Sequence, residues 1–162
     1  MLRTDSFSQE DFIKNQPIRT EFFNTHNLLH PSLRGYAHYF HENKLKEAVA
    51  AALELYENRL NEIRDMSRDV SVRSTSGGDI VYKLFQVKKL QLPYRKLGSK
   101  TRKAAYEKSF TGLLSGGVGW IRNAYTHEKH QLPELKPEEA LELLFVASYL
   151  LRMIEYSRKG KK

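Results

Sequence analysis

The chain has 162 residues, of which 40% are hydrophobic, 11% aromatic and 28% charged, a composition typical of one globular domain with a single core. Twenty-seven lysines and arginines against nineteen acidic residues give a formal net charge of +8 and a pI near 9.6. The expected charged partner is therefore a polyanion, with nucleic acid ahead of an anionic membrane. The absence of cysteine excludes a disulfide scaffold, thiolate zinc sites, iron–sulfur clusters and a cysteine nucleophile.

The N-terminal region carries no membrane or export signal. Residues 1–10 lack an apolar signal-peptide core, and the longest apolar stretch, residues 141–151, is interrupted by Glu142 and is too short to cross a bilayer. A cytoplasmic protein with no membrane partner is predicted. Residues 1–27 contain helix-compatible runs broken at Pro17, which predict an N-terminal helical arm.

The strongest helical pattern covers residues 44–67. Apolar side chains recur there at spacings of three and four, while Lys44, Glu54 and Glu57 fall on the opposite side. The apolar face consists of Leu45, Ala48, Val49, Ala52, Leu53, Tyr56, Leu60 and Ile63. We therefore expect an amphipathic helix that buries this face.

Shorter signals follow this helix. Residues 67–78 are polar and contain two adjacent glycines, a composition that predicts a loop. Asp79 can cap a short helix over residues 80–88, and Pro93 prevents that helix from reaching the next expected start at residues 99–101.

A second long helix is predicted from that start to Tyr125. Its expected apolar stripe consists of Ala105, Phe110, Leu113, Leu114, Val118, Ile121 and Tyr125. Its glycines are Gly112, Gly116, Gly117 and Gly119. A glycine in a helix interior costs about 1 kcal/mol relative to alanine. Close approach of a neighbouring helix or a kink would account for these glycines, and so would a ligand or second subunit that contacts the backbone.

The last helix has a clear start. Pro137 suits the first helical turn, and Glu138 and Glu139 interact favourably with the helix dipole. This helix is expected to end near Tyr156, and its apolar positions cover more than one face, which predicts a central helix or an oligomer interface. With no strand alternation, the chain is predicted to be an all-α helical bundle. The expected parts are an arm (1–27), a helical domain (28–157) and a basic disordered tail (158–162).

Basic residues gather between Asp79 and Glu107, a segment with no acidic residue. Tyrosines are interleaved with them from Tyr82 to Tyr106, and this mixture suits single-stranded RNA or DNA, because cations neutralise phosphates and tyrosine rings stack on unpaired bases. The candidate RNA-binding residues are Lys88, Lys89, Tyr94, Arg95, Lys96, Lys100, Arg102 and Lys103. A solvated basic face without a ligand is the alternative interpretation.

The six histidines form three pairs at spacings of three or four residues. The pairs are His26 and His30, His38 and His41, and His127 and His130. No acidic residue completes a recognised zinc pattern such as H-E-x-x-H, so surface or hydrogen-bonded histidines are expected in place of metal ligands. No metal or other cofactor is expected.

An arginine and a histidine separated by four residues occur at Arg122 and His127. The R-x(4–6)-H spacing also occurs in Arg19…His26 and Arg34…His41. The position of Arg122 beside the only tryptophan, Trp120, after a glycine-containing helix favours the first pair. The alternative assigns Arg122 to a surface ion pair and His127 to a helix C-terminal cap.

The two side chains suit chemistry on a phosphodiester. A guanidinium binds phosphate, an imidazole can move a proton at physiological pH, and RNA supplies its own 2′-hydroxyl nucleophile. On an undistorted helix residues 122 and 127 are about 140° apart, so the histidine must lie past the helix end or at a kink to reach the same phosphate. One protomer offers too few groups for base, acid and charge stabiliser, and a two-fold dimer would double the set.

Two blocks of sequence carry a family resemblance. They are Leu29-His30-Pro31, Tyr39-Phe40 and Tyr56-Glu57-Asn58-Arg59-Leu60 in the first, and Gly117 to His127, Ala140-Leu141-Glu142 and Ala147-Ser148-Tyr149-Leu150 in the second. With these blocks, residues 28–156 resemble the HEPN superfamily, and within it the uncharacterised Ymh-type proteins of phages and bacteria.

The resemblance implies an α-helical bundle, usually a homodimer, with a metal-independent ribonuclease site at the dimer cleft. His127 would act as general base or acid, Arg122 would stabilise the phosphorane, and Asn123 would orient RNA or the partner motif. The expected products are a 2′,3′-cyclic phosphate and a 5′-hydroxyl. Such domains commonly serve as toxins or abortive-infection effectors in phage defence, which makes an antitoxin or another defence protein an expected partner.

Some HEPN domains do not catalyse. The alternative function is therefore a nucleic-acid or protein binding module in a defence complex. The broad apolar face of the last helix also allows docking on a different protein.

Overall fold

The computed structural model describes residues 28–92, 99–117, 119, 123–127 and 134–159. These residues form helices joined by turns and contain no strand, which confirms the predicted all-α fold. The predicted arm over residues 1–27 lies outside them.

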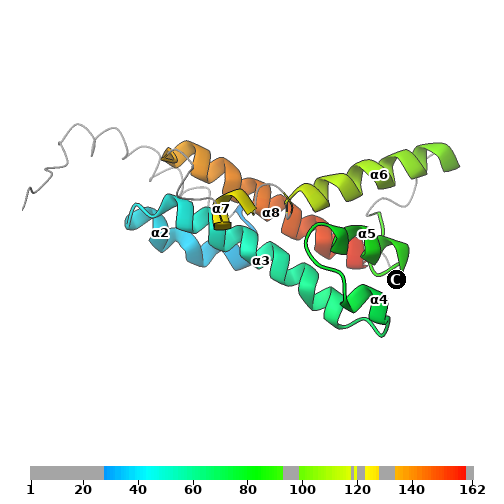
Figure 1. The fold of residues 1–162 in the computed structure, drawn as a ribbon. Helices are drawn as coiled ribbons and strands as arrows, with labels where there is room; N and C mark the ends of the chain where they lie inside the picture. Colours follow the sequence, from blue (N-terminus) through cyan, green and yellow to red (C-terminus); the bar gives the residue numbers. More distant parts are fainter. Residues whose placement is uncertain (1–27, 93–98, 118, 120–122, 128–133, 160–162) are drawn as a thin grey trace, which may run out of the picture.

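Two long helices, α3 (Leu45–Asp65) and α8 (Pro137–Lys159), form the centre of the molecule. Figure 1 shows them side by side along its length, and both begin at the same end. All eight apolar positions predicted for α3 are buried. The buried apolar residues of α8 are Ala140, Leu144, Ala147, Leu150, Leu151, Met153 and Ile154. The predicted central position of the last helix is therefore confirmed, although α8 continues past Tyr156 into the segment predicted to be a disordered tail.

The first described residues pack against the last helix. The backbone N–H of His30 donates to Ser148 Oγ at 2.7 Å. The His30 Nδ1 atom accepts from the Ser32 N–H at 3.2 Å, so Nε2 carries the proton that is shared with Glu155 Oε1 at 3.0 Å. From this anchor the chain enters η2 (Pro31–Tyr36) and α2 (Ala37–His41), both of which contact neighbouring elements of the core.

The segment predicted as a loop contains a short helix, α4 (Val70–Arg73). Asp69 caps it, because its carboxylate accepts the Ser71 N–H at 2.8 Å and the Ser71 hydroxyl at 2.7 Å. These hydrogen bonds lower the pKa of Asp69. Val72 buries its side chain in the core, so the cap and one apolar anchor form a helical turn in a polar segment.

The next helix, α5 (Asp79–Gln86), confirms the predicted short helix with a shifted start. Asp79 is its first residue and Gly78 occupies the cap position. Four apolar side chains of α5 are buried, namely Ile80, Val81, Leu84 and Phe85.

The described residues of the predicted helix from residues 99–101 to Tyr125 are helical, but they do not form one regular α-helix. The helix α6 (Lys100–Gly116) begins as expected, where Ser99 Oγ accepts the Arg102 N–H at 3.4 Å. After Gly116 the geometry changes, since Gly117 and Gly119 are π-helical, and the next described helix is α7 (Asn123–His127). This departure from α-helical geometry is the break after Gly116; residues 118 and 120–122 lie outside the described part of the chain.

The expected apolar stripe on this segment is wrong at two positions. Leu114 is buried and Phe110 and Tyr125 are partly buried against the core, but Ala105 and Leu113 are exposed. Val118 and Ile121 lie outside the described residues. Ala105 is exposed because the N-terminal half of α6 projects away from the other helices (Figure 1), whereas Leu113 lies on the side of α6 that faces away from α5.

In the part of the chain that the structure describes, no helix is both long and apolar enough to cross a bilayer.

Candidate functional site

The candidate site begins where α6 meets α3 and α8. The Tyr56 hydroxyl donates to the Leu114 carbonyl oxygen at 2.6 Å and fixes the last turn of α6 on α3. A Cβ atom added at Gly117 would lie 2.6 Å from Leu150 Cδ1 and 3.1 Å from Tyr56 Cε1. The close-approach explanation of the glycines therefore holds at Gly117, whose backbone lies against both long helices.

The other glycines of this segment have no such neighbour. An added Cβ at Gly112, Gly116 or Gly119 would meet no atom within 4 Å. Their freedom is consistent with the break in the helix, since glycine weakens regular helical geometry and π-helical turns occur frequently at functional sites.

The motif lies directly after this break. Asn123 is exposed, and its Nδ2 donates to the Gly119 carbonyl oxygen at 2.8 Å. His127 is the last described residue of α7, and residues 128–133 lie outside the described part of the chain, so the expected position of the histidine past a helix end stays a prediction. Because positions i and i+4 of a helix share a face, Asn123 and His127 lie on one side of α7. Arg122 and the side chain of His127 lie outside the described part of the structure.

Tyr125 holds α7 on the core. Its ring is half-buried and packs against the core cluster, and α7 contacts α3. Burial and, to a smaller extent, the negative charge of Glu139 raise the pKa of Tyr125. This anchoring leaves the opposite side of α7, with Asn123, exposed to solvent.

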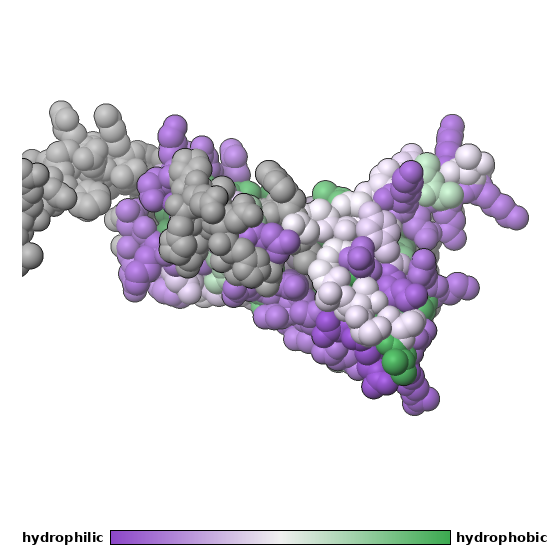
Figure 2. All heavy atoms as spheres, viewed as in Figure 1, coloured by the Kyte–Doolittle hydropathy of each residue, from purple (hydrophilic) through white to green (hydrophobic). Residues whose placement is uncertain are grey.

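The described members of the basic segment lie in two places. Lys88 and Lys89 follow the end of α5, whereas Lys100, Arg102 and Lys103 lie on the projecting half of α6. Lys88, Lys100, Arg102 and Lys103 are exposed and Lys89 is partly exposed, and none of the five forms an ion pair within the described residues. Figure 2 shows hydrophilic side chains around the free end of α6. Tyr94, Arg95 and Lys96 lie outside the described part.

Lys88 adopts an unusual backbone conformation. Its φ of 57° lies in the left-handed region, where glycine is preferred at this position after a helix. The Lys89 N–H donates to the Leu84 carbonyl at 2.8 Å and the Lys88 N–H to the Phe85 carbonyl at 3.0 Å, the two bonds of a Schellman motif. Holding a lysine there has a conformational cost, and the sequence reasoning missed this feature because lysine is not a usual signal for such a turn.

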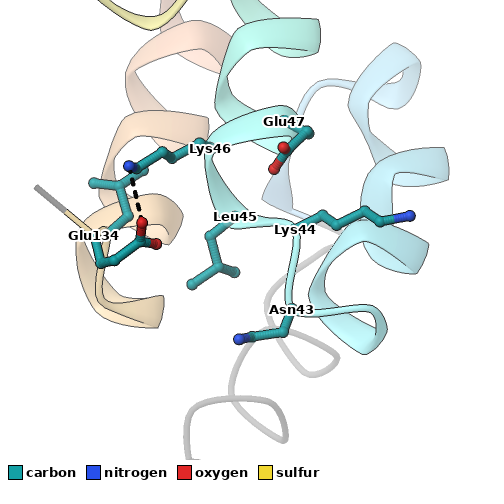
Figure 3. A pocket seen from close by; sticks show the side chains of 7 residues that line it. Asn43, Lys44, Leu45, Lys46, Glu47 and Glu134 are labelled. Atoms are coloured by element: carbon teal, nitrogen blue, oxygen red, sulfur yellow. Dashed lines mark hydrogen bonds and ion pairs between the residues drawn. The ribbon is translucent and has the colours of Figure 1, made fainter. Parts of the chain in front are cut away.

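A separate cavity of about 390 Å³ lies at the common end of α3 and α8 (Figure 3). It is lined by Asn43, Lys44, Leu45, Lys46, Glu47, Glu134 and Leu135. Lys46 Nζ and Glu134 Oε1 form an ion pair of 3.1 Å across it. With two lysines and two glutamates its charge is balanced, and no sequence signal distinguished these residues from an ordinary solvated surface.

The histidine pairs form no metal site in the described residues. No group of three histidine or acidic side chains there could hold a metal ion. Both ring nitrogens of His30 form hydrogen bonds, Nδ1 with the Ser32 N–H and Nε2 with Glu155. The His38 ring is exposed, and its centroid lies 4.1 Å from that of the Tyr39 ring.

Comparison with known proteins adds one finding. No curated protein and no solved structure matches the chain. A family model described as "Protein of unknown function (Hypoth_ymh)" matches residues 27–154, which include the core helices, the break after Gly116 and the Arg122–His127 motif. The chain therefore belongs to the Ymh family.

Proposed function

We propose that this chain is a metal-independent endoribonuclease of HEPN type that acts as a toxin or abortive-infection effector in phage defence. One observation carries the proposal. The short helix α7 follows the motif arginine directly and holds Asn123 and His127 one turn apart, with Asn123 exposed. The change to π-helical geometry after Gly116 supports the proposal, because Arg122 and His127 would lie about 140° apart on one undistorted α-helix.

The proposed chemistry uses the motif as follows. His127 removes the proton from the RNA 2′-hydroxyl or returns one to the leaving 5′-oxygen, and Arg122 stabilises the phosphorane between these steps. Asn123 orients RNA or the partner motif. The 2′-oxygen forms a bond to phosphorus as the bond to the 5′-oxygen breaks, which leaves a 2′,3′-cyclic phosphate and a 5′-hydroxyl. Two motifs facing each other across a dimer would supply both base and acid.

The exposed cations support an RNA substrate. Lys88, Lys100 and Lys103 have no ion-pair partner among the described residues and can neutralise phosphates along a strand. The net charge of +8 favours association with any polyanion, so the cations supply binding and α7 would supply the reaction.

Cleavage of total RNA in EDTA tests the proposal. The wild-type protein should produce fragments with 2′,3′-cyclic phosphate ends, and Arg122→Ala and His127→Ala should remove this activity while circular dichroism and mass stay unchanged. Arg68→Ala and His38→Ala are the matched controls, because both side chains are exposed and lie outside α7, His38 on α2 and Arg68 in the turn between α3 and α4. Cleavage that persists in the His127→Ala variant would contradict the assignment.

The second candidate function is a non-catalytic nucleic-acid or protein binding module in a defence complex. The projecting, unpaired cations of α6 favour it, since they suffice for binding without chemistry. In this case the wild-type protein should bind RNA in a filter assay without cleaving it, and His127→Ala should leave the affinity unchanged.

A further inference from the structure

The outward side of α6 is exposed in the part of the chain that the structure describes. Arg102, Tyr106, Ser109 and Leu113 follow one another at spacings of four, three and four residues, which places them on one stripe of the helix. Tyr106 is 52% exposed and Leu113 is 49% exposed. The inner side of α6 is held on α5 by the Phe85–Phe110 ring contact and by the Ser115 hydroxyl, which donates to the Gly78 carbonyl at 3.0 Å. The outward stripe is therefore not covered by any of the described residues.

A second stripe with the same spacing lies on α8. Its exposed part consists of Glu142, Val146 and Tyr149, and the next position of the stripe, Met153, is buried in the core. Val146 is 38% exposed and Tyr149 is 46% exposed, so an apolar strip interrupts the polar side of a helix whose other faces form the core. Each stripe therefore begins with one exposed charged residue and carries two exposed large apolar or aromatic side chains.

The charges of the two surfaces are complementary. Residues 100–108 of α6 contain four cations and one acid, whereas residues 137–145 at the start of α8 contain three acids and no cation. Arg102 is the first residue of the α6 stripe and lies in the basic segment, and Glu142 is the first residue of the α8 stripe and lies in the acidic segment. Opposite charges at the rim of an apolar contact select the partner and set the register of the helices.

We infer that α6 of one copy packs on α8 of a second copy of this chain, and that the partner returns the same contact. Parallel alignment of the two helices brings Arg102 opposite Glu142 and Tyr106 opposite Val146. In a two-fold dimer the α6–α8 contact occurs twice, so the buried surface area is doubled. A stable interface needs about 1,200 Å² or more of buried surface. The inference deepens the proposed function, which requires a dimer, by naming the surfaces that form it.

Charge reversal tests the contact by measuring the mass of the whole chain. Sedimentation velocity should show the wild type at twice 18.9 kDa. Arg102→Glu alone and Glu142→Arg alone should each raise the dissociation constant by about 10- to 100-fold, because like charges then face each other. An equimolar mixture of the two variants should restore the dimer, since every exchanged pair again has opposite charges. Arg68→Glu, a reversal at another exposed arginine, should leave the dimer intact.

Three outcomes would overturn the inference. They are a wild type that stays monomeric, a dimer that both reversals leave unchanged, and a mixture that fails to recover. Recovery on mixing also shows that both variants are folded. The mass measurement does not depend on RNA cleavage. If the variants change the dimer as expected but the wild type cleaves no RNA, the α6–α8 interface is supported and only the proposed ribonuclease activity is contradicted.

Discussion

Tyr56 shows how one side chain connects the core to the candidate site. It is fully buried on α3, yet its hydroxyl has a partner in the last turn of α6, immediately before the helix breaks. Burial raises the pKa of Tyr56 above its ordinary value of 10.0. The neutral phenol is therefore the form that the folded protein requires.

Tyr56→Phe should lower the free energy of unfolding near pH 7 by about 1 kcal/mol, because the Leu114 carbonyl loses its donor. The pH dependence has a defined sign. A raised folded-state pKa means that the tyrosine's contribution is complete below pH 10.0 and is lost above it, by about 1.4 kcal/mol per pH unit. Urea unfolding of both proteins at pH 7 and above pH 10 should show the difference shrinking. A constant difference would contradict the role of the buried hydroxyl.

Gly117 and Gly112 should respond to alanine in opposite directions. At Gly117 the added methyl group meets the buried Leu150 side chain and the Tyr56 ring, so Gly117→Ala should destabilise the protein by about 2 kcal/mol. At Gly112 nothing lies within 4 Å, so Gly112→Ala should stabilise it by about 0.5–1 kcal/mol through the lower entropy of the unfolded chain. Denaturant titration distinguishes them. Equal effects would mean that the approach of α8 is not what selects glycine at position 117.

At the scale of elements, the end of α5 combines strain with charge. Lys88 keeps a left-handed conformation that glycine would adopt more easily, and its ammonium group remains exposed. Strained residues cluster at functional sites. Since the conformation of Lys88 affects stability and its charge belongs to the proposed RNA surface, substitutions at this position can test the two effects separately.

Lys88→Gly should raise the free energy of unfolding by about 1 kcal/mol and weaken RNA binding at the same time. Lys88→Ala is the matched control, because it removes the charge and retains the strain, so it should weaken binding without the gain in stability. Thermal unfolding and filter binding at two salt concentrations measure both effects. If Lys88→Gly binds RNA as tightly as the wild type, the end of α5 is not part of the RNA surface.

The elements differ in how well the sequence predicts them. Regular spacing predicts α3 fully, because every residue of its apolar stripe packs on a neighbour. The same reasoning fails on α6, where apolar spacing continues through Leu113 and the helix itself leaves the core. Helix α4 was missed because one capping aspartate, Asp69, and one buried valine, Val72, outweigh a polar composition. Local patterns determine helices, whereas their length and exposure depend on packing partners far along the chain.

Some features of the candidate site could also be predicted from the sequence and others could not. The Arg122–His127 spacing was visible in the sequence, as was the charge of residues 79–107. The change to π-helical geometry after Gly116 was not, nor was the close approach of Gly117 to Leu150 and Tyr56, which brings together residues far apart in the sequence. The balanced cavity at the start of α3 has no signature in the sequence, because residues from Asn43 to Glu47 meet Glu134 only after α8 has packed.

At the scale of the whole molecule, His30 joins the beginning of the described chain to its last helix. Its backbone N–H reaches Ser148, a residue 118 positions away, and its ring reaches Glu155. Nearby, Arg152 donates to the Leu28 carbonyl at 2.7 Å. These contacts fix the first described turn against α8.

His30→Ala should lower the free energy of unfolding by about 2 kcal/mol, because the Ser32 N–H loses its buried acceptor and a cavity forms. The exposed His38 is the matched control, and His38→Ala should cost about 0.5 kcal/mol. Hydrogen exchange should then accelerate first at residues 28–33. Uniform acceleration over the whole molecule would mean that this turn does not open separately.

The late position of α8 has a consequence for synthesis on the ribosome. Until residues 137–159 have left the exit tunnel, the buried face of α3 lacks its main partner and the His30 turn has nothing to bind. The motif at α7 is translated before that point, so a chain that has reached residue 127 but not residue 159 carries the motif without the scaffold that positions it. The order of the elements thus delays assembly of the bundle until α8 has emerged, and products truncated before α8 would be unfolded substrates for proteases.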